Sequence, residues 1–181
     1  MSRAWTQPVK LRELGAGPVK VRLEPDAAER GKIAGDLGLE SLPSLVAELT
    51  VRPWLDGAEI TGRFEAVVEQ ICGVTLDPFE QTLSGEIAVQ VVPRGSPHAP
   101  GEERGEAEYD PEAPDPPDVL AGEAIDLAAY VVEHLSLEID PFPRRPGAEF
   151  AYEPATKEES PFAVLGKLKG PKGPSGGPSG A

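Results

Sequence analysis

The chain has 181 residues, which fits one domain with tails, and its 17 Lys and Arg stand against 31 Asp and Glu, giving a net charge of −14. Such an acidic body repels a nucleic-acid backbone, so a basic protein partner suits it better; the alternative is that the charge only keeps the protein soluble. No apolar run approaches the roughly 20 residues needed to cross a bilayer, and the first residues lack the apolar stretch of a signal peptide, so we expect a cytoplasmic protein that binds no membrane.

The N-terminal 24 residues are the basic part of the chain, with a local charge of +3 that leaves −17 for the rest. Apolar and charged residues alternate there and predict short strands over 8–12 and 18–24. Asp26 is a candidate N-cap and Gly38 a candidate stop for a helix over 26–38. Because RNA phosphates attract clustered cations, the basic residues of this part are the candidate RNA contacts: Lys10, Arg12, Lys20 and Arg22.

An Asp-Gly pair between two alternating segments predicts a β-hairpin. Apolar residues alternate with polar ones over 44–55 and again over 58–70, with Asp56-Gly57 between them. A two-residue turn at this pair places Leu49 opposite Phe64, and the apolar residues of both strands then share one face. The turn chemistry and the hydrophobic pattern therefore agree on the same hairpin.

A third strand and a second helix follow. Residues 82–92 alternate in the same way and extend the hairpin into an antiparallel meander. Residues 94–122 are rich in Pro, Gly and acidic groups, so they predict a mobile acidic insertion. Asp126 then begins a helix over 126–138.

These elements predict an α+β fold with an antiparallel meander, or a partly closed sheet, and two helices. We expect a single domain over residues 1–155 that includes the acidic insertion. Residues 156–181 are expected to add a short apolar segment and a disordered tail of Gly, Pro and Ser. That tail has almost no apolar side chain to bury, so folding should not depend on it.

No catalytic set stands out. His134 falls on the apolar stripe of its helix, which favours a packed, hydrogen-bonded histidine over a catalytic base, and His98 falls in the predicted mobile insertion. Cys72 is predicted to be a buried structural thiol rather than a reactive one. One cysteine and two distant histidines make no closed zinc site. We therefore predict no catalytic residue, no metal site and no cofactor.

The loop from Cys72 to Phe79 joins two strands and yet is apolar. Loops usually lie on the surface, so these side chains either pack back on the domain or are covered by a partner. Both alternatives stay open for Phe79 in particular. The candidate partner-binding residues are Val74, Leu76, Asp77, Pro78 and Phe79.

Three segments together resemble the YceD family of large ribosomal RNA subunit accumulation proteins. They are Cys72-Gly73-Val74-Thr75-Leu76-Asp77-Pro78-Phe79, the run from Ile125-Asp126-Leu127 to Pro141-Phe142-Pro143, and Pro161-Phe162-Ala163-Val164-Leu165-Gly166-Lys167-Leu168-Lys169. The similarity spans roughly residues 5–169. Many relatives carry further cysteines that suggest a metal; with Cys72 alone, that role is not carried over.

The resemblance implies a bacterial factor in large ribosomal subunit biogenesis that supports accumulation or processing of 23S ribosomal RNA, with no known reaction. The implied partners are a precursor of the large subunit, a small basic ribosomal protein and ribosomal RNA. We predict a non-catalytic adaptor on these grounds. The alternative is a metal-dependent nuclease that processes precursor ribosomal RNA, although the densest carboxylates here lie in the predicted mobile insertion rather than on rigid elements.

Overall fold

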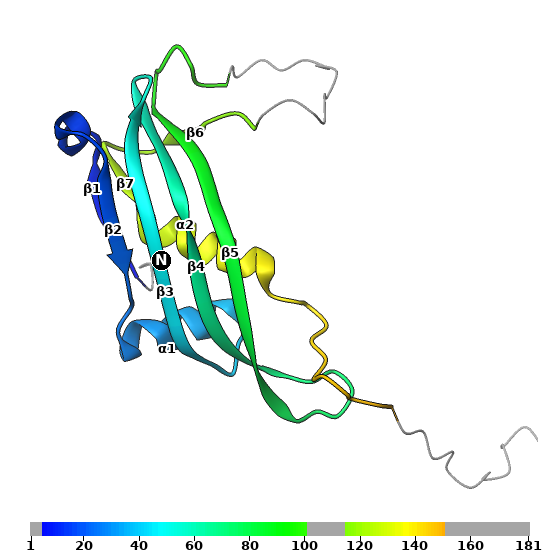
Figure 1. The fold of residues 1–181 in the computed structure, drawn as a ribbon. Coiled ribbons are helices and arrows are strands. Elements are labelled where there is room, and N and C mark those ends of the chain that lie inside the picture. Colours follow the sequence, from blue (N-terminus) through cyan, green and yellow to red (C-terminus); the bar gives the residue numbers. More distant parts are fainter. Residues whose placement is uncertain (1–4, 101–114, 151–181) are drawn as a thin grey trace, which may run out of the picture. The chain divides into compact units, whose positions relative to one another are not determined.

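The computed structural model describes residues 5–100 and 115–150, and its centre is a five-stranded β-sheet that carries two helices on one face (Figure 1). A separate two-stranded sheet lies beside it. The elements in chain order are β1 (Pro8–Lys10), the 3₁₀ helix η1 (Leu11–Ala16), β2 (Val19–Leu23), α1 (Ala27–Leu37), β3 (Ser41–Trp54), β4 (Gly57–Ile71), β5 (Pro78–Pro93), β6 (Asp118–Leu120), β7 (Ala124–Asp126) and α2 (Leu127–Glu138). The α+β class is confirmed.

The large sheet has the strand order β2-β3-β4-β5-β6. Strands β2 to β5 are antiparallel neighbours, so the predicted meander is confirmed, and β6 pairs with β5 in parallel. Among the described residues β2 and β6 do not pair with each other, so the sheet is open and the expected partial closure is not supported. No helix in the described part of the chain is long and apolar enough to span a membrane.

The β3–β4 register differs by two residues from the one that the sequence predicts. Trp54 pairs with Gly57, so Leu55 rather than Gly57 is a turn residue, with a φ of 52°. Phe64 consequently lies opposite Ala47 instead of Leu49. Because side chains alternate with period two, an even shift keeps every side chain on its predicted face. The face prediction is therefore confirmed, and the predicted cross-strand partners are wrong.

The physical reason is the environment of Gly57. It has no positive φ; instead, a Cβ at this position would collide with the carbonyl oxygen of Val91 in β5. A glycine is required here because β4 and β5 approach each other closely, and a local sequence pattern does not predict that approach. The turn then falls on Leu55 and Asp56.

The hydrophobic core lies between one face of the sheet and the two helices. The odd-numbered residues of β3 and the even-numbered residues of β4 supply its sheet side, with Phe64 at the centre. Helix α1 begins with a capping box, in which Asp26 and Glu29 each accept the other's main-chain N–H at 2.8 Å, and ends at Gly38 in the left-handed region. Both predicted limits of this helix are confirmed.

The second helix is confirmed as well, but its expected cap is not. The Asp126 side chain makes no cap hydrogen bond, and its Oδ1 accepts the main-chain N–H of Gln7 at 2.9 Å. This carboxylate therefore ties the N-terminal strand to the start of α2. The apolar stripe of α2 is buried as expected, at Leu127, Val131 and Leu135.

Two short regions depart from the sequence prediction. The strand expected over 8–12 ends at Lys10, because η1 turns the chain and places Leu14 in the core. Strands β6 and β7 were missed, and β6 lies inside the insertion predicted over 94–122. Residues 101–114 of that insertion, and the segment and tail predicted beyond residue 155, lie outside the described residues.

Candidate partner-binding site

The loop between β4 and β5, residues 72–77, is closed by its own main chain. The N–H of Cys72 donates to the carbonyl of Asp77, and the N–H of Leu76 donates to the carbonyl of Cys72, both at 2.9 Å. This closure holds Leu76 at a φ of 61°, in the left-handed region that a leucine rarely adopts. Its side chain is nevertheless 75% exposed. The fold thus fixes a strained, apolar side chain in water.

Cys72 anchors this loop to the segment that follows α2. Its thiol is fully buried, as predicted, and Sγ accepts the main-chain N–H groups of Thr75 at 3.5 Å and Arg145 at 3.4 Å. The N–H of Gly73 donates to the carbonyl of Pro143 at 2.9 Å. These bonds join two distant parts of the chain, since Cys72 and Arg145 are 73 residues apart in the sequence.

Hydrogen bonds from Thr75, and then from the Arg145 main chain, lower the pKa of Cys72 from 9.0 to about 6, against the desolvation that opposes ionisation. A depressed pKa contributes stability that is fully present above the unfolded value and is lost as the pH falls through the folded value. We therefore expect the free energy of unfolding to decrease as the pH is lowered from 9.0 to about 6. In Cys72→Ser this component should be missing, because serine does not ionise. Urea titrations of both proteins across this range would measure it; parallel profiles would contradict the expectation.

The candidate partner-binding residues differ in exposure. Val74 is half-buried, and Phe79, the second residue of β5, is only 9% exposed, so little of it is accessible. Asp77 and Pro78 are exposed, and Asp77 pairs with Arg145 at 3.8 Å. Leu76 is therefore the most exposed large apolar side chain of this loop.

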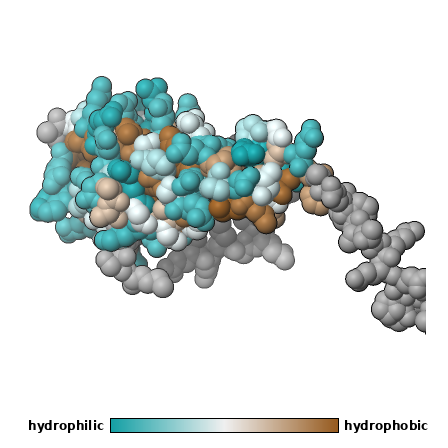
Figure 2. Space-filling view, turned by 90° about the horizontal axis from the view of Figure 1, so that it is seen from below, coloured by the Kyte–Doolittle hydropathy of each residue, from teal (hydrophilic) through white to brown (hydrophobic). Residues whose placement is uncertain are grey.

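Two further exposed apolar residues were missed by the sequence reasoning. Leu137, in the last turn of α2, is 76% exposed, and Phe142, in the segment that Gly73 and Arg145 hold, is 79% exposed. The Pro141-Phe142-Pro143 sequence was a signal, because prolines on both sides keep the aromatic residue in a loop. Seen from below, the surface is mostly hydrophilic, with brown residues scattered over it and a larger brown patch toward the lower right (Figure 2).

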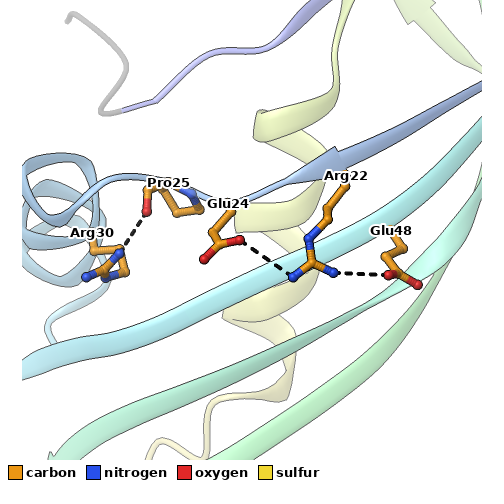
Figure 3. A network of polar contacts seen from close by, with 5 residues as sticks. All are labelled: Arg22, Glu24, Pro25, Arg30 and Glu48. Carbon is orange, nitrogen blue, oxygen red and sulfur yellow. Dashed lines mark hydrogen bonds and ion pairs between the residues drawn. The ribbon is translucent and has the colours of Figure 1, made fainter.

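The four candidate RNA contacts are all exposed but lie on different elements. Lys10 is on β1 and Arg12 on η1, while Lys20 and Arg22 share the outer face of β2. Arg22 lies between two glutamates and pairs with Glu24 at 3.6 Å and with Glu48 at 3.2 Å (Figure 3). Each of these pairs is exposed, so an incoming phosphate would displace it at little cost.

The structure brings Lys20 and Arg22 together with a third cation, Arg63 of β4, around an open groove of about 570 Å³ on the outer face of the sheet. Lys10 and Arg12 do not line this groove. Glu48 and Glu86 do line it, so its local charge is only slightly positive. The alternation of β4 placed Arg63 on the polar face, but only the strand pairing reveals that it meets Glu48 and the β2 cations.

Groups with acid–base or metal chemistry are dispersed. Within the described ranges, no three His, Cys, Asp or Glu side chains are grouped so that they would hold a metal ion. The Nδ1 atom of His134 lies 2.9 Å from the carbonyl oxygen of Tyr130, one helical turn earlier. The half-buried imidazole is thus bonded to its own helix, as expected for a packed histidine.

A family model described as "Large ribosomal RNA subunit accumulation protein YceD" matches residues 60–169, which is more than half of the chain. The match begins in β4, so β1 to β3 lie outside it, whereas the β4–β5 loop, α2 and the Pro161–Lys169 motif lie within it. Comparisons with curated proteins and with solved structures give no match. The family resemblance inferred from the three sequence motifs is confirmed: the chain belongs to the YceD family.

Proposed function

We propose that this protein is a non-catalytic factor in biogenesis of the large ribosomal subunit, which binds a pre-ribosomal particle through its β4–β5 loop and supports accumulation of 23S ribosomal RNA. The family description supports the process. The observation that carries the contact is Leu76, a leucine that is 75% exposed at a φ of 61°. Such strain persists only where the surrounding structure imposes it, and it concentrates at functional sites.

The chemistry of the surface supports a mixed partner. Leu76 and Phe142 offer apolar contacts, and the groove at Lys20, Arg22 and Arg63 offers the cations that a phosphate would need. Most of the remaining charge is acidic, which suits a basic ribosomal protein better than bare RNA. The partner is therefore a particle that presents both RNA and basic protein.

The loop contact is tested by comparing two strained, exposed leucines. We expect tagged Leu76→Ser to keep the melting temperature of the wild type and to lose co-sedimentation with large-subunit precursors on sucrose gradients. Leu55→Ser is the matched control, because Leu55 is also exposed and has a positive φ but lies in the β3–β4 turn, at the other end of β4. Equal loss of co-sedimentation in both variants, or in neither, would remove the loop from the proposal.

The RNA contact and the alternative of a nuclease are tested by two separate experiments. Replacing Lys20 and Arg22 by Gln should weaken co-sedimentation at physiological salt more than the same change at Lys10 and Arg12, because only the first pair lines the groove.

Purified protein incubated with precursor ribosomal RNA and Mg²⁺ should leave the RNA intact. Cleavage that a single Asp→Asn or Glu→Gln substitution abolishes would replace this proposal with the nuclease.

A further inference from the structure

Strand β5 has an unusually long open edge. It pairs with β4 along its whole length, from Pro78 to Val91, in one uninterrupted register. On its other side, among the described residues, only Val91–Pro93 have a partner, the short strand β6. Figure 1 shows β5 as the long strand at the right of the sheet. Among the described residues, a row of main-chain groups without a strand partner therefore extends from Glu80 to Ala88.

The direction of these groups follows from strand geometry. The Val91 carbonyl is directed at β4, because a Cβ on Gly57 would collide with it. Main-chain N–H and C=O groups alternate sides along a strand, so the other odd-numbered residues of β5 also bond to β4. The even-numbered residues then direct their N–H and C=O groups to the open edge, namely Glu80, Thr82, Ser84, Glu86, Ala88 and Gln90.

This edge lacks most of the devices that normally protect one. Exposed edges are blunted by short length, Pro, bulges or charged side chains, especially Lys, and of these the interior of β5 carries only the charged Glu80 and Glu86. The interior of β5 has no Lys, no Pro and no bulge, whereas the opposite edge strand, β2, is five residues long, carries Lys20 and Arg22, and has Pro18 just before it. The contrast suggests that the β5 edge is kept open.

The charge around the open edge is mainly negative, although Arg63 of β4 lies opposite Glu86. No Lys or Arg occurs in residues 64–93 or in residues 115–143, and these two segments include β5, β6 and α2. Where the open edge reaches β6, a groove of about 570 Å³ is lined by Ala88, Val89 and Gln90 together with carboxylates. Those carboxylates belong to Glu59, Asp115 and Asp118.

We propose that the β5 edge binds an extended Lys- and Arg-rich segment of a partner protein, which adds to the sheet as a further strand. Main-chain hydrogen bonds supply the affinity in this mode, and the side chains supply the specificity. Basic side chains of the added strand on the outer face would lie beside Glu80 and Glu86, and opposite charges at neighbouring cross-strand positions are favourable. The proposal rests on the proposed function, because it names the basic protein component of the particle as the occupant.

The probe is a labelled peptide of alternating Lys and Val, and binding to the full chain is measured by fluorescence anisotropy. Ala88→Pro removes an outward N–H without removing a bond to β4, and proline is tolerated on such edges. We expect it to weaken binding about tenfold or more, through loss of a hydrogen bond and obstruction of the edge. Glu80→Gln with Glu86→Gln should weaken binding and its salt dependence, whereas the control Glu24→Gln, beside β2, should change it less than about twofold.

Three results would overturn the proposal. One is wild-type peptide affinity in folded Ala88→Pro. Another is equal binding of an alternating Glu and Val peptide, or preferential binding of a single-stranded RNA. The third is slow hydrogen exchange at Thr82, Ser84, Glu86 and Ala88 in the free full-length protein, since the edge would then be covered by its own chain. If Ala88→Pro does not fold, the glutamine variant and peptide-induced slowing of exchange at these amides decide the question.

Failure of this inference can be told apart from failure of the proposed function. If the edge variants lose the peptide but still co-sediment with large-subunit precursors, the edge does not recruit the particle and the proposal falls, while the function stands. If the wild type binds the peptide at the edge and does not co-sediment, the proposed function falls and the edge remains a binding site for basic segments.

Discussion

Replacing Phe64 with Ala is expected to lower the free energy of unfolding by about 3–5 kcal/mol. The side chain is 1% exposed and lies on the helix-covered face of β4. Its ring fills the space over Gly85 in the neighbouring strand, where an added Cβ would lie 2.6 Å from the ring. Truncation would leave a cavity that Gly85, which has no side chain, does nothing to fill.

The expected loss in Phe64→Ala is large compared with the total stability of a domain. Domains of this kind have a total stability of about 5–15 kcal/mol, so the variant would lose a large part of it. Urea denaturation followed by circular dichroism measures the change, with an unchanged slope as the sign that the folded state itself is intact. Val67→Ala is the matched control, since Val67 is on the same strand but faces the outer side and is half-buried. It should cost about 1 kcal/mol or less, and equal losses would mean that the two faces are assigned wrongly.

Replacing Gly57, the first residue of β4, with Ala is expected to lower the free energy of unfolding by about 3 kcal/mol. This is the upper end of the usual cost of overpacking. The added Cβ meets the carbonyl oxygen of Val91 and lies 2.9 Å from its carbonyl carbon and from Cα of Val92, all of them main-chain atoms of β5. No side chain can rotate to make room, so one strand would have to shift. The melting temperature and the loss of protection from hydrogen exchange at Val91 report that shift.

The companion variant is Leu55→Gly. Because Leu55 has a φ of 52° and is 58% exposed, glycine removes strain and little packing. We expect stability to be unchanged or to rise by up to about 1 kcal/mol, after the greater freedom of glycine in the unfolded chain is taken into account. A clear loss at Leu55 together with a tolerated Gly57→Ala would favour the register with Asp56 and Gly57 at the centre of the turn.

Local patterns in the sequence determined a large share of this fold. Period-two alternation gave β3, β4 and β5 and the face that each residue occupies, because that alternation is set by the backbone alone. The capping box at Asp26 and the left-handed Gly38 gave α1 to within a residue, since both signals act within one helical turn. The same local reasoning singled out the β4–β5 loop and the buried position of Cys72.

The remaining features depend on contacts between distant parts of the chain. The hairpin register was decided by the approach of Gly57 to Val91. The β4–β5 loop is joined through Cys72 to Arg145, and the cation groove combines Arg63 of β4 with two residues of β2. The sequence by itself therefore determined the two helices, the three long strands, the faces of those strands and the family. Only the tertiary structure decided which strand edge stays open and which apolar side chains remain in water, because both depend on where segments far apart in the sequence come to lie.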